Sequence, residues 1–167
     1  FEERKVNILV GTQMVTKGLD FDNVSLVGIL NADSMMNFPD FRSFERSFQL
    51  MTQMSGRSGR HTKENESPGI VVIQTYSVEH PSVVYSQKHD YVGFVEKELE
   101  NRKQLNYPPF HKLVSLKIQS PELKDVKYTA EGLAQQASLL KARFDVFKDV
   151  ELLGPASAPI AKLRNNF

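Results

Sequence analysis

The sequence has no cysteine and no tryptophan, and its four histidines are scattered along 167 residues. Without cysteine there is no disulfide bond and no thiolate metal site, and scattered histidines do not form a metal-ligand cluster. No apolar run is long enough to span a bilayer, and no secretory leader is recognisable. We therefore expect a cytoplasmic protein with no membrane partner and no metal site in this chain.

A large excess of charge of either sign is also missing, since the formal net charge is +1. Residues 1–105 carry 12 Lys and Arg against 14 Asp and Glu, a balance of −2, and residues 106–167 carry 9 against 6, a balance of +3. This asymmetry is far weaker than the basic surface of a free-standing nucleic-acid binder. We expect weak affinity for polyanions, located mainly in the C-terminal part.

Three short, continuous apolar runs occupy residues 6–10, 24–30 and 69–75. Runs of this length predict strands that are covered on both faces, as in a parallel sheet between helices. The first run leads directly into a loop that begins with Gly11. The sequence therefore predicts an α/β fold with a functional loop after its first strand.

Helices are predicted between and after these strands. Pro39 and Asp40 predict a turn and an N-cap, and an apolar stripe with helical spacing follows, typical of core packing. Its members are Phe41, Phe44, Phe48 and Met51. His80 and Pro81 begin another predicted helix, and residues 90–105 form a further one whose dense mixed charge predicts a solvated face.

A second unit is expected after residues 106–112, because two adjacent prolines cannot continue a helix. Residues 112–119 alternate apolar and polar side chains and predict a half-buried strand. Residues 122–144 carry an apolar stripe that predicts a helix lying on a small sheet, with a coiled coil as the alternative. Residues 150–155 begin another predicted strand. Such a unit buries too little to be complete, and we expect it to be truncated.

The first candidate site is the glycine-framed loop at residues 11–20. A P-loop requires glycine directly before its lysine and Ser or Thr directly after it. Lys17 instead lies between Thr16 and Gly18, so this loop is not a primary triphosphate site. Backbone N–H groups and threonine hydroxyls in such a loop can still bind a phosphate.

The second candidate site is the segment at residues 50–60. It ends in two arginines, and a glycine directly precedes each of them. Gln53 lies one helical turn before Arg57, and Arg60 follows. We expect the glycines to allow close packing beside both arginines. Arginine suits phosphate because its charge is fixed and its donors form a planar fork. The pattern predicts an arginine finger that completes a phosphoryl-transfer site.

Together these segments resemble a known family. "GTQMVTKGLDF", followed by "QMSGRSGR", is similar to motifs V and VI of superfamily 2 helicases. The longer stretches "DFRSFERSFQLMTQMSGRSGR", "GIVVIQTYSVEHP", "RKQLNYPPF" and "LLGPASAPIAKLR" resemble the PriA family of primosomal replication-restart DNA helicases. The resemblance covers nearly the whole chain.

This resemblance implies an α/β fold in which residues 1–105 form the second RecA-like helicase lobe, with its parallel sheet between helices. Residues 106–167 would form the small α+β C-terminal domain, similar to ribosomal protein S10 and here incomplete. The family's first lobe, with its P-loop, would lie outside this chain. Its zinc-binding cysteines would also lie elsewhere, in agreement with the absence of cysteine.

The resemblance also implies site residues, cofactors and partners. ATP, Mg²⁺ and zinc are the expected cofactors of the family. Forked and single-stranded DNA, single-stranded DNA-binding protein and other primosome proteins are the expected partners. The implied roles are catalytic contact with the γ-phosphate for Gln53, Arg57 and Arg60, nucleotide binding for Gly18 and Asp20, and DNA binding for Thr12, Gln13 and Lys17.

The implied activity is ATP-dependent 3′→5′ unwinding of forked DNA at the start of primosome assembly. Because the P-loop would lie in another lobe, we expect this chain alone to hydrolyse no ATP. Two alternatives remain from the residues themselves. One is a stand-alone nucleic-acid-binding module, and the other is an α/β enzyme whose loop binds a small phosphate ligand.

Overall fold

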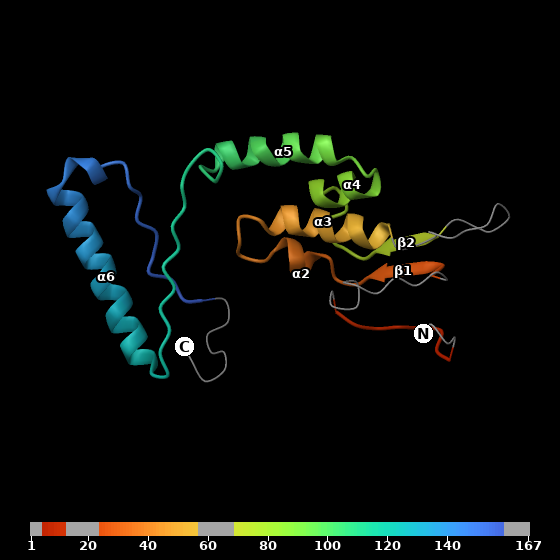
Figure 1. Cartoon of the computed structure of the whole chain (residues 1–167), viewed down its shortest axis with the longest axis horizontal. Coiled ribbons are helices and arrows are strands. Elements are labelled where there is room, and N and C mark those ends of the chain that lie inside the picture. The colour runs from red at the N-terminus through yellow and green to blue at the C-terminus, as the bar shows by residue number, and fades with distance from the viewer. Residues whose placement is uncertain (1–4, 13–23, 57–68, 159–167) are drawn as a thin grey trace. The chain divides into compact units, whose positions relative to one another are not determined.

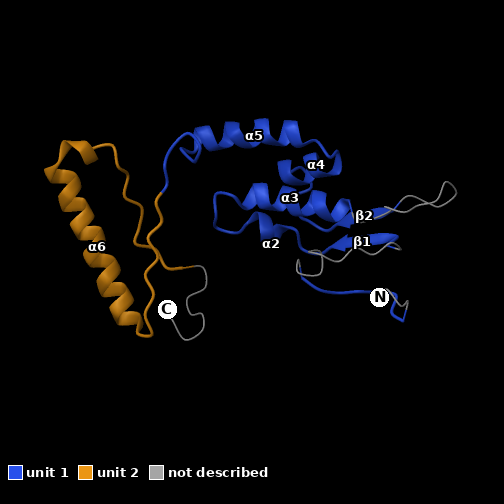
Figure 2. Ribbon diagram, viewed as in Figure 1, with its two compact units in different colours: residues 1–113 blue, residues 114–167 orange. Residues whose placement is uncertain are grey.

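A computed structural model describes residues 5–12, 24–56 and 69–158. The chain divides into two compact units, residues 1–113 and residues 114–167, which Figure 2 distinguishes by colour. Within these ranges, the first unit contains a small sheet and four helices, and the second contains one long helix followed by a 3-10 turn (Figure 1). Each unit is described by itself below.

The sheet of the first unit consists of β1 (Leu26–Ile29) and β2 (Ile70–Ile73), which are parallel. Their register pairs Leu26 with Ile70 and Ile29 with Ile73. The two predicted strands at 24–30 and 69–75, and their parallel arrangement, are therefore confirmed.

The strand predicted at residues 6–10 is wrong, because this segment lies outside any strand. Its apolar side chains are in solvent, with Ile8 80% and Val10 83% exposed. An apolar run indicates a tendency to be buried, but a strand also needs a neighbour that supplies hydrogen bonds. Among the described residues no strand pairs with this segment.

The two faces of the sheet differ in their environment. Ile29 points into the core, whereas Leu26, Ile70 and Val72 on the opposite face are more than half exposed. The prediction that both faces are covered is therefore wrong for the described part of the chain. Side-chain composition predicts which faces can be buried, while the elements that cover them depend on distant parts of the sequence.

The described residues of this unit also form four helices: α2 (Asp33–Met36), α3 (Ser43–Ser55), α4 (Pro81–Gln87) and α5 (Tyr91–Gln104). The predictions of α3, α4 and α5 are confirmed, and Pro81 occupies the first turn of α4 as expected, whereas α2 was not predicted. Asp40 is not the N-cap of α3, because the N-cap is Arg42. The Asp40 carboxylate instead accepts the backbone N–H of Arg42 at 2.9 Å, which fixes the turn before the helix.

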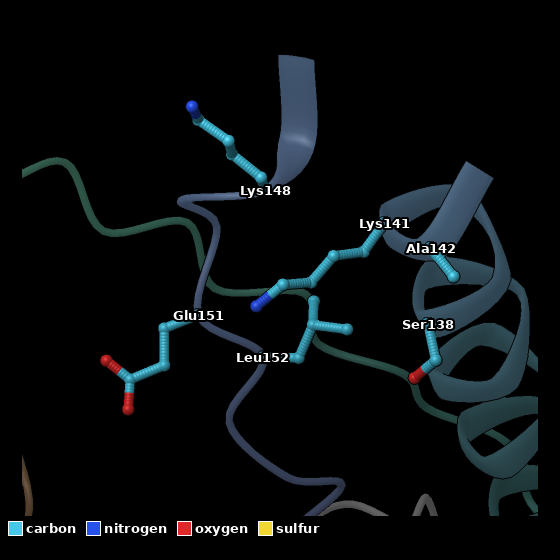
Figure 3. Close-up of a pocket in the computed structure, with 6 residues that line it drawn as sticks. All are labelled: Ser138, Lys141, Ala142, Lys148, Glu151 and Leu152. Atoms are coloured by element: carbon cyan, nitrogen blue, oxygen red, sulfur yellow. The ribbon is translucent and has the colours of Figure 1, made fainter. Parts of the chain in front are cut away.

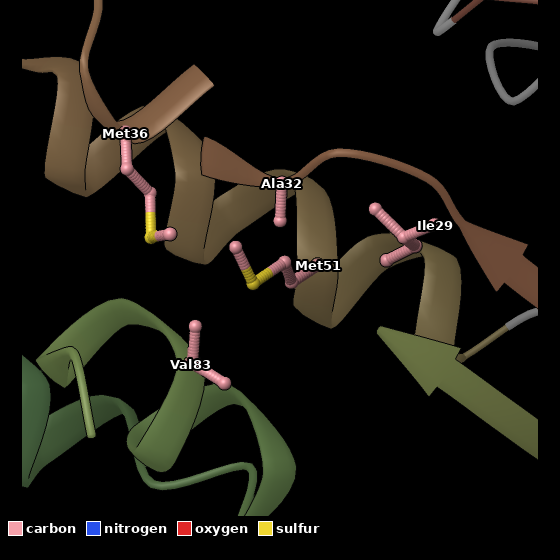
Figure 4. Packing of buried hydrophobic residues seen from close by; sticks show 5 residues of the cluster. All are labelled: Ile29, Ala32, Met36, Met51 and Val83. Atoms are coloured by element: carbon pink, nitrogen blue, oxygen red, sulfur yellow. The ribbon is translucent and has the colours of Figure 1, made fainter. Parts of the chain in front are cut away.

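The core of this unit is formed where α3 meets the sheet, α2 and α4. Five buried side chains form one apolar cluster (Figure 4): Ile29, Ala32, Met36, Met51 and Val83. Beside it, Phe48 of α3 stacks on Phe94 of α5, with ring centroids 4.2 Å apart. The predicted core role of the α3 stripe is confirmed for Met51 and Phe48, while Phe41 and Phe44 are half-buried at its edge.

An ionic network joins α3 to α5. Arg102 donates from Nε to Glu98 and from Nη2 to Glu45, with both distances 2.8 Å. The side chains of Arg102 and Glu98 are only 12% and 8% exposed. The prediction that the charges of α5 form a solvated face is therefore wrong for this pair. Burial raises the pKa of Glu98, and the hydrogen bond from Arg102 opposes that shift.

The second unit contains α6 (Leu123–Arg143) and the 3-10 turn η1 (Asp145–Phe147). The helix predicted at 122–144 is confirmed. The strands predicted at 112–119 and 150–155 are wrong, since both segments lack strand structure, and Val114 and Leu116 are 80% and 76% exposed. The described residues of this unit therefore provide no sheet to cover α6, and none of the residues of α6 is buried.

An open recess lies between the last turns of α6 and the segment after η1 (Figure 3). Figure 3 shows Lys141 extending from the helix toward Leu152, and Lys148 also lines the recess. Ser138 and Ala142 line the helical side and Glu151 the other. Two lysines and one carboxylate line this recess, a balance of +1.

We predict that Arg102→Met lowers the free energy of unfolding by about 3 kcal/mol, because the substitution leaves the Glu98 carboxylate buried without its partner. The loss should be smaller at pH 5 than at pH 8, since protonation of Glu98 removes the uncompensated charge. Urea unfolding of the 167-residue chain measures both. Lys97→Met is the matched control, because Lys97 pairs with Glu100 in solvent and should change stability very little. Equal losses for the two variants would contradict the buried network.

Candidate functional site

The structure describes two of the eight predicted site residues. Gln53 lies in α3, and Thr12 lies at the end of the described segment 5–12, where its side chain is exposed. The other six lie outside the described residues, and their roles remain predictions: Gln13, Lys17, Gly18, Asp20, Arg57 and Arg60. The candidate site is therefore built from α3, the element that leads into the arginine segment.

The C-terminal end of α3 places Gln53 in solvent. The residue is exposed, while Met51, two positions earlier, is fully buried. The helix ends at Ser55, and the N–H of Gly56 donates to the carbonyl of Thr52 at 3.1 Å. A Cβ on Gly56 would lie 3.6 Å from the Gln53 carbonyl oxygen, an ordinary contact. The described neighbours therefore leave room for a Cβ at position 56. The expectation that Gly56 allows unusually close packing is not met among them.

Several contacts fix the position and rotation of α3. The Ser82 hydroxyl donates to the carbonyl of Phe44 at 2.9 Å, and the ring of His80 meets the Phe44 ring edge-on at 4.4 Å. From the same helix α4, the Ser86 hydroxyl lies 3.6 Å from the sulfur of Met51. With the Phe48–Phe94 stack and the Arg102 network, these contacts hold α3 against α4 and α5. A helix anchored in this way presents its exposed side chains in a defined direction.

One buried polar atom lies next to Gln53. The hydroxyl of Thr52 is buried and has no hydrogen-bond partner among the described residues. Buried hydroxyls are normally paired, so this atom is an exception in the core-facing side of α3. Sequence reasoning gave no sign of it, because a threonine in a helix usually bonds to the carbonyl four residues earlier.

A second polar arrangement lies at the carboxyl ends of the two strands. Asp33, which follows β1, accepts the hydroxyl of Thr75 at 2.9 Å and the backbone N–H of Tyr76 at 3.0 Å, both after β2. Partial desolvation acts to raise the pKa of Asp33, but these hydrogen bonds lower it below its usual value. These two hydrogen bonds, called the Asp33 clamp below, fix the loop between β2 and α4. The sequence signal for it was a single aspartate directly after a strand, which by itself is weak.

The site offers binding groups rather than a complete catalytic apparatus. In residues 5–12, 24–56 and 69–158 no three His, Asp or Glu side chains come together as a metal site. Across the same ranges, no helix combines the length and the apolar character needed to cross a membrane. What the structure provides is an anchored helix with an exposed amide near its end, directly before the two predicted phosphate-binding arginines.

Two family models match different parts of the chain. The helicase conserved C-terminal domain matches residues 1–62, which include α3 and the arginine segment. The primosomal protein N C-terminal domain matches residues 103–167.

Curated relatives align with the whole chain. Replication restart protein PriA of Bacillus subtilis is 44% identical over all 167 residues. The chain belongs to the PriA family. The PriA proteins of Synechocystis sp. and Borreliella burgdorferi are 43% and 36% identical, again over the full chain. The chain spans about a fifth of the length of these PriA relatives, at 20%, 19% and 24% respectively. The predicted family is thus confirmed.

The anchoring of α3 by α4 should depend on pH through His80. Its Nδ1 accepts the N–H of Ser82 and caps α4, so Nδ1 must be unprotonated in the folded chain. Burial lowers the pKa of His80 below 6.5, while the charge of Asp33 opposes the shift. Protonation therefore favours the unfolded chain, and this stabilisation is present above pH 6.5 and lost as the pH falls through the lowered folded-state pKa.

We predict that His80→Asn reduces the loss of unfolding free energy between pH 7 and pH 5 by up to about 1 kcal/mol, the usual worth of an N-cap, because asparagine caps without titrating. Urea unfolding at a series of pH values measures the difference. His89→Asn is the control, since His89 is exposed and caps no helix. Parallel pH profiles for the unaltered chain and His80→Asn would contradict this role.

Proposed function

We propose that this chain forms the second RecA-like lobe and the C-terminal domain of an ATP-dependent 3′→5′ DNA helicase. The longer protein would unwind forked DNA and start primosome assembly for replication restart. The observation that carries the proposal is α3, an anchored helix whose exposed Gln53 begins the Gln-x-x-Gly-Arg-x-Gly-Arg segment. Membership of the PriA family supports the same function, because its relatives are named replication restart proteins.

On the nucleotide side, the exposed amide of Gln53 fits a polar ligand such as a phosphate group. Arg57 and Arg60 would bind the γ-phosphate and stabilise negative charge in the transition state. Gly18 and Asp20 would lie at the nucleotide end of the preceding loop. ATP would supply the phosphoryl group and Mg²⁺ would neutralise part of its charge, both held mainly by another lobe.

On the DNA side, Thr12, Gln13 and Lys17 would contact the sugar–phosphate backbone. The exposed side chain of Thr12 is compatible with such a contact. Forked and single-stranded DNA, single-stranded DNA-binding protein and other primosome proteins are the proposed partners, in the cytoplasm.

We also propose an S10-like α+β fold for residues 106–167 in the longer protein, and zinc bound elsewhere in it. The long helix α6 supports the first point. A structure of the longer protein would test both.

The chain alone should hydrolyse no ATP above background, because the β- and γ-phosphates and Mg²⁺ have no P-loop here. A phosphate-release assay with and without single-stranded DNA measures this. DNA-stimulated turnover that copurifies with the chain through successive columns would refute the division of the ATP site between two lobes.

In the longer protein, Arg60→Ala should lower ATP turnover by roughly 10³-fold, the size of effect known for arginine fingers, and Arg57→Ala should act similarly. DNA affinity should change only a few-fold. Lys103→Ala, an exposed cation on α5, is the control and should retain normal turnover. If Arg60→Ala abolished DNA binding but left turnover per bound complex unchanged, the proposed role at the γ-phosphate would be wrong.

A further inference from the structure

Two exposed arginines meet on one carboxylate at the beginning of α3. Asp40 Oδ1 accepts Arg42 Nε at 3.2 Å, and Asp40 Oδ2 lies 3.0 Å from Arg46 Nη1. The side chains of Arg42 and Arg46 are 48% and 53% exposed. The two guanidinium groups are thus held close together at the surface, at the opposite end of α3 from Gln53 (Figure 1).

The charges of this cluster do not cancel. Hydrogen bonds from Arg42 lower the pKa of Asp40, and the charges of Arg46 and Arg42 add to the shift, so the carboxylate stays ionised. One negative and two positive charges leave a balance of +1. Glu45, the nearest acidic residue along α3, bonds to Arg102 and Gln49, and no ion pair between it and Arg42 or Arg46 occurs among the described residues.

Apolar rings accompany the arginine pair. The guanidinium of Arg42 lies 5.3 Å from the centre of the Phe41 ring, a stacking contact that restricts its orientation. Phe38, in the same turn, is 49% exposed. A surface that combines guanidinium groups with an accessible aromatic ring is suited to single-stranded nucleic acid, where the charges meet phosphates and the ring meets a base.

Folding alone explains only part of this arrangement. The Asp40 carboxylate is needed for the turn, because it accepts the backbone N–H of Arg42 at 2.9 Å. The backbone carbonyl of Asp40 also accepts the N–H of Ser43 at 2.9 Å. A second exposed ion pair, from Arg46, adds at most about 1 kcal/mol. About half of each arginine side chain is exposed, at 48% and 53%, so guanidinium N–H groups are accessible to the oxygens of a phosphodiester.

We propose that Arg42 and Arg46, organised by Asp40 and flanked by Phe38, form a binding site for the phosphodiester backbone of single-stranded DNA. This arginine pair is separate from the predicted contacts at Thr12, Gln13 and Lys17. The choice of DNA as the ligand rests on the proposed helicase function, whereas the site itself rests on the geometry of the turn. The site adds one or two phosphate contacts to the helicase lobe, whose overall charge is slightly negative.

The test is a titration of fluorescein-labelled oligo(dT) with the 167-residue chain at several salt concentrations. The double variant Arg42→Gln/Arg46→Gln should bind about fivefold more weakly at the lowest salt. The magnitude of its log–log salt slope should fall by about 0.7 to 1.4, the contribution of one or two single-strand phosphates. Lys97→Gln/Lys103→Gln removes the same charge from exposed positions of α5 and should change neither quantity appreciably.

Two further variants keep the test informative. Asp40→Asn retains an acceptor oxygen for the turn but removes the competing charge, so it should tighten binding. If the double variant does not fold, as judged by circular dichroism, Arg46→Gln alone carries the test, because its guanidinium contacts only Asp40 among the described ion pairs.

The possible failures are distinguishable. Unchanged binding by the arginine variants, or an equal loss in the lysine control, would overturn this site and leave the proposed helicase function intact. If the unaltered chain bound no oligonucleotide at any salt concentration, both this site and the proposed DNA binding by the chain would be wrong.

Discussion

The first unit depends on one constraint, the burial of the apolar side of α3. This single helix contacts β1, α2 and α4 through Met51 and contacts α5 through the Phe48–Phe94 stack. Because interiors are close-packed, fixing these contacts fixes the rotation of the helix about its axis. The rotation in turn decides which residues remain in solvent, namely Gln53 near one end and the Arg42–Arg46 pair at the other. Packing therefore determines which polar side chains of α3 are presented to solvent.

Hydrogen bonds and ion pairs restrict the orientation of α3 further than its apolar contacts do. The buried Glu98–Arg102 pair reaches Glu45 near the start of α3, and the Ser82 hydroxyl reaches the Phe44 carbonyl. Hydrogen bonds require particular angles as well as distances, so they exclude small rotations that apolar contacts would tolerate. At the sheet edge, the Asp33 clamp holds the loop that leads into α4. Each of these contacts joins segments far apart in the sequence.

The sequence predicted the local elements better than their long-range partners. The paired strands followed from apolar runs, while helices α3 to α6 and the buried role of Phe48 and Met51 followed from periodicity and helix-start signals. Helix α2 was not predicted. The strands predicted at 6–10, 112–119 and 150–155 were wrong, because strand formation requires a neighbour that a local pattern does not specify. The Glu98–Arg102 pair was missed, although its i,i+4 spacing beside Phe94 was a usable signal. Gln53 was predicted from its motif. The contacts of Asp40 with Arg42 and Arg46 were recognised only in the structure.

The central claim is that α3 presents Gln53 to a nucleotide phosphate, and matched substitutions on the same helix test it most directly. Gln49 lies one turn earlier, is also exposed, and bonds to Glu45 within the helix. In the longer protein, Gln53→Ala should lower the kcat of DNA-stimulated ATP hydrolysis about tenfold, the value of one hydrogen bond made in the transition state. Gln49→Ala should leave kcat unchanged. Equal kcat values for the two variants would contradict the account.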